Sequence, residues 1–325
     1  MKIVCIVCGI LGAVIGAGFA SGREIMHFFT CYGSFSWGLA ILAAVCMGGI
    51  IYWIMGFENL SSLLPGGKFA WIGRGLMAVL LLGTAGSMTA AAGELAALTV
   101  PLRHARGVGL LLTLGICLEL SKRGVGALAS LGQILLPLTA LAWGLCCFLP
   151  AEPAQTAQET WGRIPLGIGN ALCYSAMNSM LSSGILCDAG RLCTPKERRQ
   201  AAIGAGMLLG CFLLLGNGAL IRHRMELSGQ ALPTVILLRR YGKMGYYLSA
   251  LMLYLAVTST LIAVLRGLIT LVGYVAHRHP AALAGLLTAL VTLGGFEWIV
   301  ARVYPFMGLM SLAALLFSMK KSESR

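Results

Sequence analysis

The start of the chain places charged side chains directly after an apolar, glycine-rich run. Arg23 and Glu24 follow a segment that glycines interrupt at positions 9, 12, 16, 18 and 22. Because glycine costs up to about 1 kcal/mol in a helix interior relative to alanine, this pattern predicts a helix that unwinds in its middle. The backbone groups freed there could bind an ion or a polar solute. Close packing of small residues would explain the glycines alone, but not the charges that follow.

A second polar interruption opens the other half of the chain. From Pro165 to Gly184 an otherwise apolar stretch carries hydroxyl and amide side chains, at Asn170, Tyr174, Ser175, Asn178, Ser179, Ser182 and Ser183. This stretch is too polar to contact lipid on all sides, so we expect it to face protein or water. Interrupted hydrophobic segments at the start of each half are typical of transporters built from inverted repeats.

Three consecutive hydroxyl residues, Thr258, Ser259 and Thr260, lie inside a long apolar segment. Hydroxyls in membrane helices usually bond back to a carbonyl one turn earlier, and this remains an alternative here. Three in succession cannot all face the same neighbour, however, and a hard cation is bound by oxygen atoms. The group is therefore a candidate for an ion site.

Arg23, Glu24 and Glu94 are candidates for gating or for carrying a proton. An ionisable group inside a membrane helix is costly to desolvate and is a functional hypothesis by default. Glu94 follows a run of small residues; alternatively, it lies near a helix end and reaches the lipid headgroups. We hypothesise that Arg23 and Glu94 pair across an outer vestibule as a gate.

The sequence contains no pattern typical of a catalytic site. The five histidines are scattered, and neither an HExxH nor a GxSxG motif occurs. Most of the eleven cysteines lie within apolar blocks, where cysteine behaves as a small packing residue. We therefore predict that the protein is not an enzyme, needs no cofactor and binds no metal beyond sodium.

The elements that must hold these residues are membrane helices. Of 325 residues, 58% are hydrophobic and 11% are charged, whereas a soluble domain has about 25% charged residues. The apolar residues fall in blocks, and a membrane span needs roughly 20 predominantly apolar residues. We expect about ten spans, at residues 3–29, 36–57, 70–98, 107–120, 124–149, 164–188, 199–220, 244–274, 281–296 and 300–319.

The predicted fold is an all-α integral membrane protein in which residues 1–325 form a single transmembrane domain. Five spans follow the start of each interrupted segment, so one repeat would cover residues 3–149 and the other residues 164–319. With the N-terminus inside, the cytoplasmic side holds thirteen Lys and Arg residues and the opposite side nine, which favours cytoplasmic termini. The same rule accounts for the net charge of +13 without a nucleic-acid partner.

The run from Gly12 to Ile25 reads GAVIGAGFASGREI, and His27-Phe28-Phe29 and Tyr32-Gly33 follow it. Together with Tyr304-Pro305 near the C-terminus, this run resembles the YkvI-like family of bacterial membrane proteins, over the whole chain. Through that family the chain is similar to the amino acid–polyamine–organocation transporters. The resemblance implies a LeuT-like fold, a five-plus-five inverted repeat in which helices 1 and 6 are broken.

The resemblance also implies an ion site and a solute site. In sodium-coupled relatives, carbonyls at the first break and two hydroxyls of helix eight bind sodium, which corresponds here to Gly12, Ile15, Ala256, Ser259 and Thr260. Proton-coupled relatives can place a lysine on helix five, but residues 124–149 contain none; Glu94 could carry a proton instead. The solute would lie against Ala17, Gly18, Ser21, Gly22, Tyr174, Ser175 and Asn178. No buried acidic residue in either break is expected to hold an amine.

These features predict a secondary active transporter of a small organic solute, an amino acid or a related compound, coupled to sodium. The resemblance implies alternating access by rocking of helices 1, 2, 6 and 7 against the rest. The alternative is a membrane ligand sensor that does not transport, similar to the permease-like subunits of germinant receptors; a third is a structural subunit that binds no solute. We expect a bacterial cytoplasmic membrane, with the lipid bilayer and a small solute as partners and no obligate protein partner.

Overall fold

The structure is a computed structural model that describes residues 2–64, 70–99, 104–150, 163–274, 277–293 and 304–323. Every regular element in these ranges is helical. Five of the described segments are long and apolar enough to cross a membrane: Thr30–Ile54, Trp71–Thr99, Val125–Phe148, Pro195–Ile221 and Gly242–Val272. The apolar helices Lys2–Val14 and Pro280–Thr292 are shorter. The count of ten spans and the inverted repeat stay predictions.

The first predicted span is divided into short helices, as the glycines indicate. It consists of α1 (Lys2–Val14), α2 (Ala17–Ala20) and α3 (Arg23–Phe28), followed by the 3-10 helix η1 (Thr30–Phe35). Gly16 is extended between α1 and α2, and Gly22 adopts a left-handed conformation (φ 80°) between α2 and α3. Left-handed backbone carries no steric cost for glycine, so the chain can change direction here.

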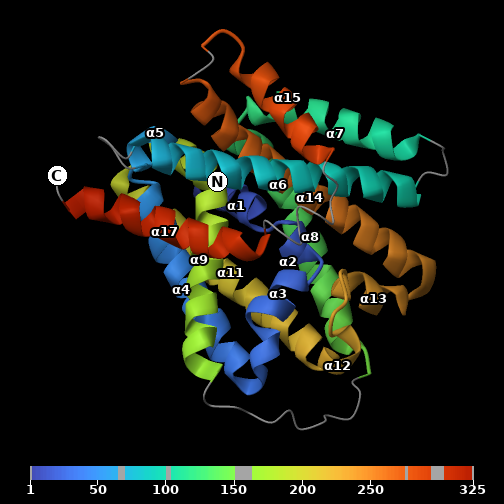
Figure 1. Ribbon diagram of the computed structural model, residues 1–325. Helices are drawn as coiled ribbons and strands as arrows, with labels where there is room; N and C mark the ends of the chain where they lie inside the picture. Colours follow the sequence, from blue (N-terminus) through green and yellow to red (C-terminus); the bar gives the residue numbers. More distant parts are fainter. Residues whose placement is uncertain are drawn as a thin grey trace.

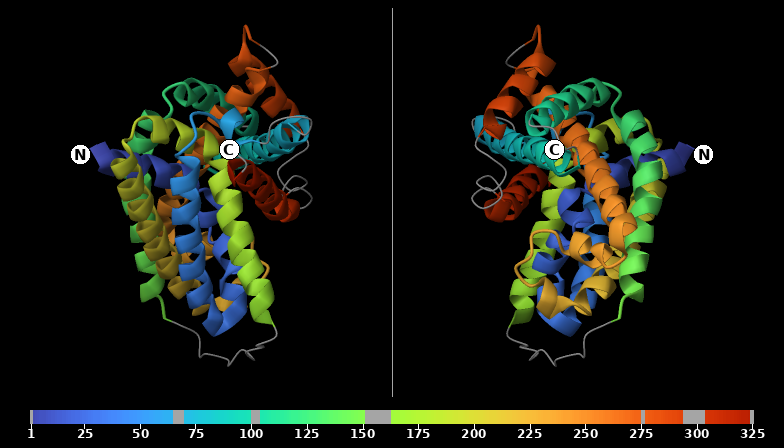
Figure 2. Two further views of the ribbon diagram at one scale, coloured as in Figure 1. Left: turned by 90° about the vertical axis from the view of Figure 1, so that its left-hand side faces the viewer. Right: turned by 90° about the vertical axis from the view of Figure 1, so that its right-hand side faces the viewer.

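Four longer helices surround the first segment. α1 packs against α8 (Val125–Phe148) and α11 (Pro195–Ile221), and α4 (Ser36–Ile54) packs against α11 and α9 (Ile164–Leu181) (Figures 1 and 2). A Cβ added to Gly132 of α8 would collide with the Cys8 carbonyl of α1, and one added to Gly12 would lie 3.0 Å from Leu128 O. Small-residue packing is therefore part of the explanation for the glycines of α1.

A buried hydrogen-bond chain fixes the end of the first segment. The Thr30 hydroxyl donates to the Asn217 side-chain oxygen at 2.9 Å, and the Asn217 amide donates to the Ser36 hydroxyl at 2.8 Å. All three side chains are fully buried. Because the three side chains lie on η1, α11 and α4, these hydrogen bonds link the 3-10 helix after the first segment to two long apolar helices.

The remaining helices form the other side of the bundle around α14 (Gly242–Val272). α14 packs against α6 (Ala70–Thr99), α7 (Ala105–Ser121) and α15 (Pro280–Thr292), while α17 (Tyr304–Glu323) packs against α9 and α6. The short helix α5 (Leu60–Leu63) lies at the upper end in Figure 1. At the lower end, the stretch after α11 folds into α12 (Arg224–Leu227) and α13 (Pro233–Arg239), and α13 packs on α14 and α8.

The second interruption is slight and lies later than the polar residues suggest. α9 ends at Leu181 and α10 (Ser183–Arg191) begins two residues later. Ser182 keeps near-helical angles (φ −89°, ψ −1°), and its N–H still bonds to Asn178 O at 3.2 Å. The break therefore lies one turn beyond Asn178.

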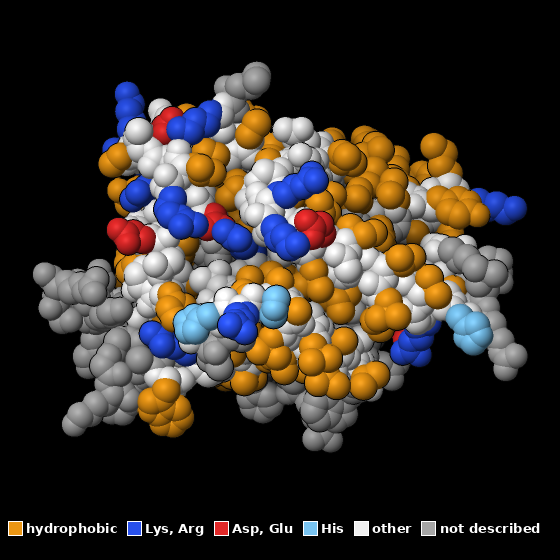
Figure 3. All heavy atoms as spheres, turned by 90° about the horizontal axis from the view of Figure 1, so that it is seen from above, with side chains coloured by type: hydrophobic (Ala, Val, Ile, Leu, Met, Phe, Trp, Pro, Cys, Tyr) orange, Lys and Arg blue, Asp and Glu red, His pale blue; other side chains and the backbone are white. Residues whose placement is uncertain are grey.

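Basic side chains gather at the upper end of the molecule. Figure 3, which views this end, shows Lys and Arg side chains over one part of the face and apolar side chains over much of the rest. The junction of α10 and α11 contributes Arg191, Lys196 and Arg199, all exposed, and Lys2 pairs with Glu197 at 3.0 Å.

Candidate functional site

The first candidate site is the break between α1 and α2. Ile15 still donates its N–H to Leu11 O at 2.7 Å, but Gly16 is extended (φ −92°, ψ −178°) and the helix does not continue. No hydrogen bond among the described residues ends on the carbonyl oxygen of Gly12, Val14 or Ile15. Backbone groups at membrane depth are tolerated only where protein or water satisfies them. These three oxygens are therefore available to a ligand.

Thr260 of α14 faces this break. A Cβ added to Gly16 would lie 2.7 Å from Thr260 Oγ1, so the hydroxyl is beside the extended residue. Thr260 is 8% exposed, and its Oγ1 has no hydrogen-bond partner within the described ranges. The other two hydroxyls bond back along α14: Thr258 to carbonyls at 2.9 and 3.0 Å, and Ser259 to Ala256 O at 3.0 Å. One of the three predicted hydroxyls is thus directed at the break.

The predicted ion ligands lie at the end of α1 and on α14. Gly12, Ile15 and Thr260 each offer an oxygen that makes no hydrogen bond among the described residues, whereas Ser259 and Ala256 bond to each other. Carbonyl and hydroxyl oxygens are ligands that suit a hard cation. The assignment of all five residues to one sodium site stays a prediction.

The second interrupted segment meets the first through Ser182. Its hydroxyl donates to the Ala13 carbonyl at 3.2 Å, so the last turn of α1 is tied to the junction of α9 and α10. The neighbouring Ser183 hydroxyl bonds back to Met180 O at 2.6 Å. Two segments far apart in sequence are therefore joined at their irregular points.

The solute residues predicted in the first segment lie in and directly after α2, where the chain changes direction at Gly22. Ala17 and Gly18 are half-buried in α2, and Ser21 is buried, with its hydroxyl donating to Gly18 O at 3.1 Å. The Ser21 carbonyl accepts a hydrogen bond from the Thr234 N–H at 2.9 Å. A Cβ on Gly22 would lie 2.9 Å from the Trp143 ring and 3.1 Å from Thr234 Oγ1. α13 and α8 therefore cover this end of the break.

The solute residues predicted in the second segment divide into two groups. Tyr174 is fully buried, packs its ring against Phe28 (5.3 Å between centroids) and Phe29 (5.0 Å), and its hydroxyl has no partner in the part of the chain that the structure describes. Ser175, by contrast, donates to carbonyls of α9 and α4 at 2.8 and 3.1 Å. The Asn178 amide donates to a carbonyl one turn earlier, at 3.2 Å. Tyr174 thus faces α3, while the Ser175 hydroxyl is directed at α4.

An acidic residue is buried beside the first break, although no buried acidic residue there was expected to hold an amine. Glu24 is 5% exposed, and its side chain lies so close to Gly18 that a Cβ added there would collide with the carboxylate. The carboxylate is also within electrostatic range of Tyr174. Glu24 was a candidate only for gating or proton transfer because its burial depends on the direction that α3 takes after Gly22, which the sequence does not specify.

Arg23 and Glu94 do not pair in this structure. Glu94 forms an ion pair with Arg106 of α7 at 2.6 Å, and both side chains are well exposed, at 43% and 60%. Arg23 is exposed at the start of α3. Glu94 lies in the last turns of α6, where the short connection to α7 brings Arg106 beside it. This agrees with the alternative position near a helix end.

Sequence reasoning missed two further polar residues at the break. Trp143 Nε1 and Thr234 Oγ1 are buried and without a hydrogen-bond partner among the described residues, and both side chains lie beside Gly22. Buried polar atoms are nearly always satisfied by protein, water or a ligand. Together with the Tyr174 and Thr260 hydroxyls, they indicate a place where a ligand or water completes the hydrogen bonding. A single Trp in an apolar helix offers no signal for this.

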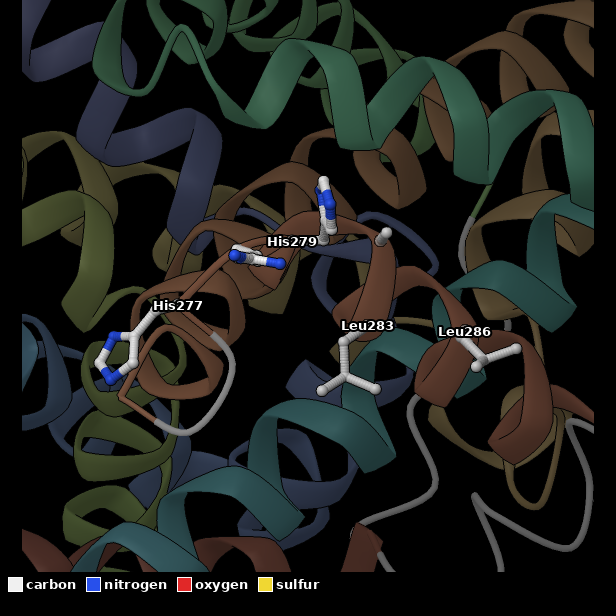
Figure 4. A pocket seen from close by; sticks show the side chains of 6 residues that line it. His277, His279, Leu283 and Leu286 are labelled. Carbon is white, nitrogen blue, oxygen red and sulfur yellow. The ribbon is translucent and has the colours of Figure 1, made fainter.

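A cavity of about 690 Å³ lies elsewhere, at the connection between α14 and α15. Its lining consists of His277, Arg278, His279, Ala282, Leu283 and Leu286. Figure 4 shows the two histidines on the connection and the two leucines along α15. The three charged or titratable residues are exposed, and none of the six belongs to the break. We therefore place the candidate site at the break and not in this surface cavity.

Comparison with curated proteins gives two uncharacterized relatives, one of which is named a membrane protein. The chain is 24% identical over 324 residues to the uncharacterized membrane protein YkvI of Bacillus subtilis, covering 93% of this chain and 91% of YkvI. It is 25% identical over 323 residues to YyaD of the same organism, with 94% and 93% covered. No family model matches the sequence.

Comparison with solved structures identifies the fold. MhsT in complex with L-phenylalanine superposes with a TM-score of 0.63 at 13% identity, over 97% of this chain and 87% of MhsT. The Eremococcus coleocola manganese transporter, in complex with an aromatic bis-isothiourea compound, superposes with a TM-score of 0.59 at 15% identity, over 98% and 76%. The resemblance seen in the first segment is therefore confirmed: the chain is a membrane protein similar to YkvI, and it has the LeuT-type fold of these transporters.

Proposed function

We propose that the protein is a secondary active transporter of a small organic solute, an amino acid or a related compound, and that sodium is the coupling ion. The observation that carries this proposal is the arrangement at the first break. Carbonyl oxygens of Gly12, Val14 and Ile15 make no hydrogen bond within the described ranges, and a buried Thr260 hydroxyl without a partner lies beside Gly16. Unwound backbone facing a hydroxyl is how secondary transporters bind coupling ions near the middle of the membrane.

The similarity to solved transporters supports the same reading. One of the structures with this fold is a manganese transporter, and MhsT holds L-phenylalanine. A fold can host several functions, so the site decides between them. The Trp143 and Thr234 side chains lie beside Gly22, Tyr174 packs on Phe28 of α3, and each of the three carries a buried polar atom without a partner among the described residues. A polar organic solute fits such surroundings better than a metal ion alone.

The packing supports alternating access by movement of one group of helices. α1, α4, α9 and α11 pack against one another, and the Thr30–Asn217–Ser36 chain joins two of them to η1. A group held together in this way can rock as a unit against α14, α6 and α7. The basic residues at the upper end (Figure 3) favour a cytoplasmic position for that end, with the N-terminus inside a bacterial cytoplasmic membrane.

Reconstituted protein tests the proposal directly. Liposomes that contain it are adsorbed on a solid-supported membrane electrode, given an inward sodium gradient and exposed in turn to each standard L-amino acid. We expect at least one of them to evoke a current that disappears when choline replaces sodium. The double variant Ser259→Ala/Thr260→Ala should abolish the current, and Thr258→Ala, one residue away, is the matched control.

The possible outcomes separate the candidate functions. A current that persists in choline and follows a proton gradient contradicts sodium coupling. A solute that stabilises the protein against heat but evokes no current and no uptake favours a ligand sensor. If no solute binds at all, the transporter proposal fails.

A further inference from the structure

Glu24 lies against α2, within the first interrupted segment, because the chain changes direction after α2. Ser21 and Gly22 donate their N–H groups back to Ala17 O and Phe19 O, at 2.8 and 2.9 Å, and close the single turn of α2. Gly22 is then left-handed (φ 80°), so α3 begins in a new direction. Glu24, the second residue of α3, returns its side chain to the backbone of Gly18.

The Glu24 carboxylate occupies the space that a side chain at position 18 would fill. Any side chain at Gly18 would collide with the Glu24 carboxylate. Glu24 is 5% exposed although it lies among membrane helices, where a carboxylate is strongly disfavoured and marks a binding or proton-transfer position. A buried carboxyl group therefore lies beside the interrupted helix.

The groups around Glu24 are suited to a positively charged nitrogen. Tyr174 packs on Phe28, one turn after Glu24 on α3, and its hydroxyl has no partner among the described residues. The Tyr174 ring packs against those of Phe28 and Phe29, with centroids 5.3 and 5.0 Å away. An ammonium group donates to carboxylate, hydroxyl and carbonyl oxygens and is attracted to the faces of aromatic rings.

We infer that the transported solute carries a protonated amine and that the Glu24 carboxylate binds this group, with the Tyr174 hydroxyl as a second acceptor. The inference rests on the proposed transport function and names the substrate class of the same site. Amino acids, diamines and other organic ammonium compounds belong to this class. Simple carboxylates and phosphates do not, because like charge beside a buried carboxylate opposes their binding.

Binding to the unmodified protein gives the first test. Thermal stability in sodium is measured with matched sets of probes that share a carbon skeleton: L-amino acids and diamines, the corresponding deaminated acids, and the corresponding alcohols. We expect every stabilising probe to contain an ammonium group. If the strongest stabilising probes are acids or alcohols, the inference is wrong, whether or not any variant folds.

Two variants of Glu24 give the second test. Glu24→Gln removes the charge and should weaken binding of the best ammonium probe by about tenfold or more, as loss of one partner of a buried charge pair does. Glu24→Asp keeps the charge and should lose less. Glu119→Gln, at an exposed acidic residue of α7 paired with Lys122, is the matched control and should bind as the unmodified protein does.

Measurements of amine affinity, sodium response and uptake together separate this inference from the proposed function. Unchanged amine affinity in Glu24→Gln, or loss of the sodium response without loss of amine preference, would assign Glu24 to another role and overturn the inference. Sodium-driven uptake of an amine-free solute would overturn it while supporting transport. Amine binding that depends on Glu24 without any uptake would support the inference and contradict the transport proposal.

Discussion

Replacing Thr260 with valine removes one oxygen from the centre of the bundle while leaving the outline of the side chain nearly unchanged. The Thr260 hydroxyl is buried and has no hydrogen-bond partner within the described ranges. A buried hydroxyl without a partner costs about 1–3 kcal/mol. In the absence of sodium, Thr260→Val should therefore raise the free energy of unfolding, by about 1–2 kcal/mol.

Sodium should reverse the order of the two proteins. An ion that binds only the folded state adds RT ln(1 + [L]/Kd), about 2.7 kcal/mol at a hundredfold excess over Kd. The unmodified protein should gain this stability, and Thr260→Val should gain little because it lacks a ligand oxygen. The variant is thus expected to be the more stable protein in choline and the less stable one in sodium.

The measurement is the free energy of unfolding in mixed micelles titrated with SDS, in sodium chloride and in choline chloride at equal ionic strength. Thr258→Val is the matched control, because its hydroxyl bonds to two carbonyls of its own helix at 2.9 and 3.0 Å. This control should lose about 0.5–1.5 kcal/mol in both salts. If Thr260→Val is destabilised like the control and still responds to sodium, the assignment of the hydroxyl to an ion site is refuted.

Two further predictions concern the upper end of the bundle. Gly190→Ala should lower the free energy of unfolding by about 1–3 kcal/mol, because the added Cβ would collide with the Met55 carbonyl. Gly144→Ala is the control: its Cβ would meet open space, and the free energy of unfolding should change by no more than about 1 kcal/mol. Equal effects of the two variants in an SDS titration would contradict the close contact between Gly190 and Met55. Asp188→Asn breaks an ion pair with Arg266 at 2.6 Å, in which the side chains are 14% and 28% exposed, and should cost about 1–3 kcal/mol. A double-mutant cycle with Arg266→Met measures the coupling, and a coupling near zero would contradict it.

The first break could be predicted because its signals are local. The glycine spacing around Gly16 and the charges directly after Gly22 depend on neighbours in the sequence, and the structure unwinds the chain at these residues. The membrane class follows from composition in the same way. Gly12 also allows α1 and α8 to approach closely. This helix packing was the alternative explanation for the glycines.

The arrangement of side chains at the site could not be predicted, because it depends on contacts between elements. The burial of Glu24 depends on the direction that α3 takes after Gly22, and the orientation of Ser175 toward α4 depends on how α9 packs. Similarly, Glu94 pairs with Arg106 because α7 follows α6 closely. Residue types identified these candidates, but only the packing decides which of them meet.

In the proposed transport cycle, the hydrogen bond from the Thr234 N–H to the Ser21 carbonyl would stabilise the form in which α13 covers the break. Opening the break from the α13 end would then break this bond, and an intramolecular hydrogen bond contributes a net of about 1 kcal/mol. That amount corresponds to roughly a fivefold population ratio, small enough for solute binding to invert. Because both partners are backbone groups, most substitutions at either position leave the bond in place, so distant relatives with few residues in common can retain the same closure.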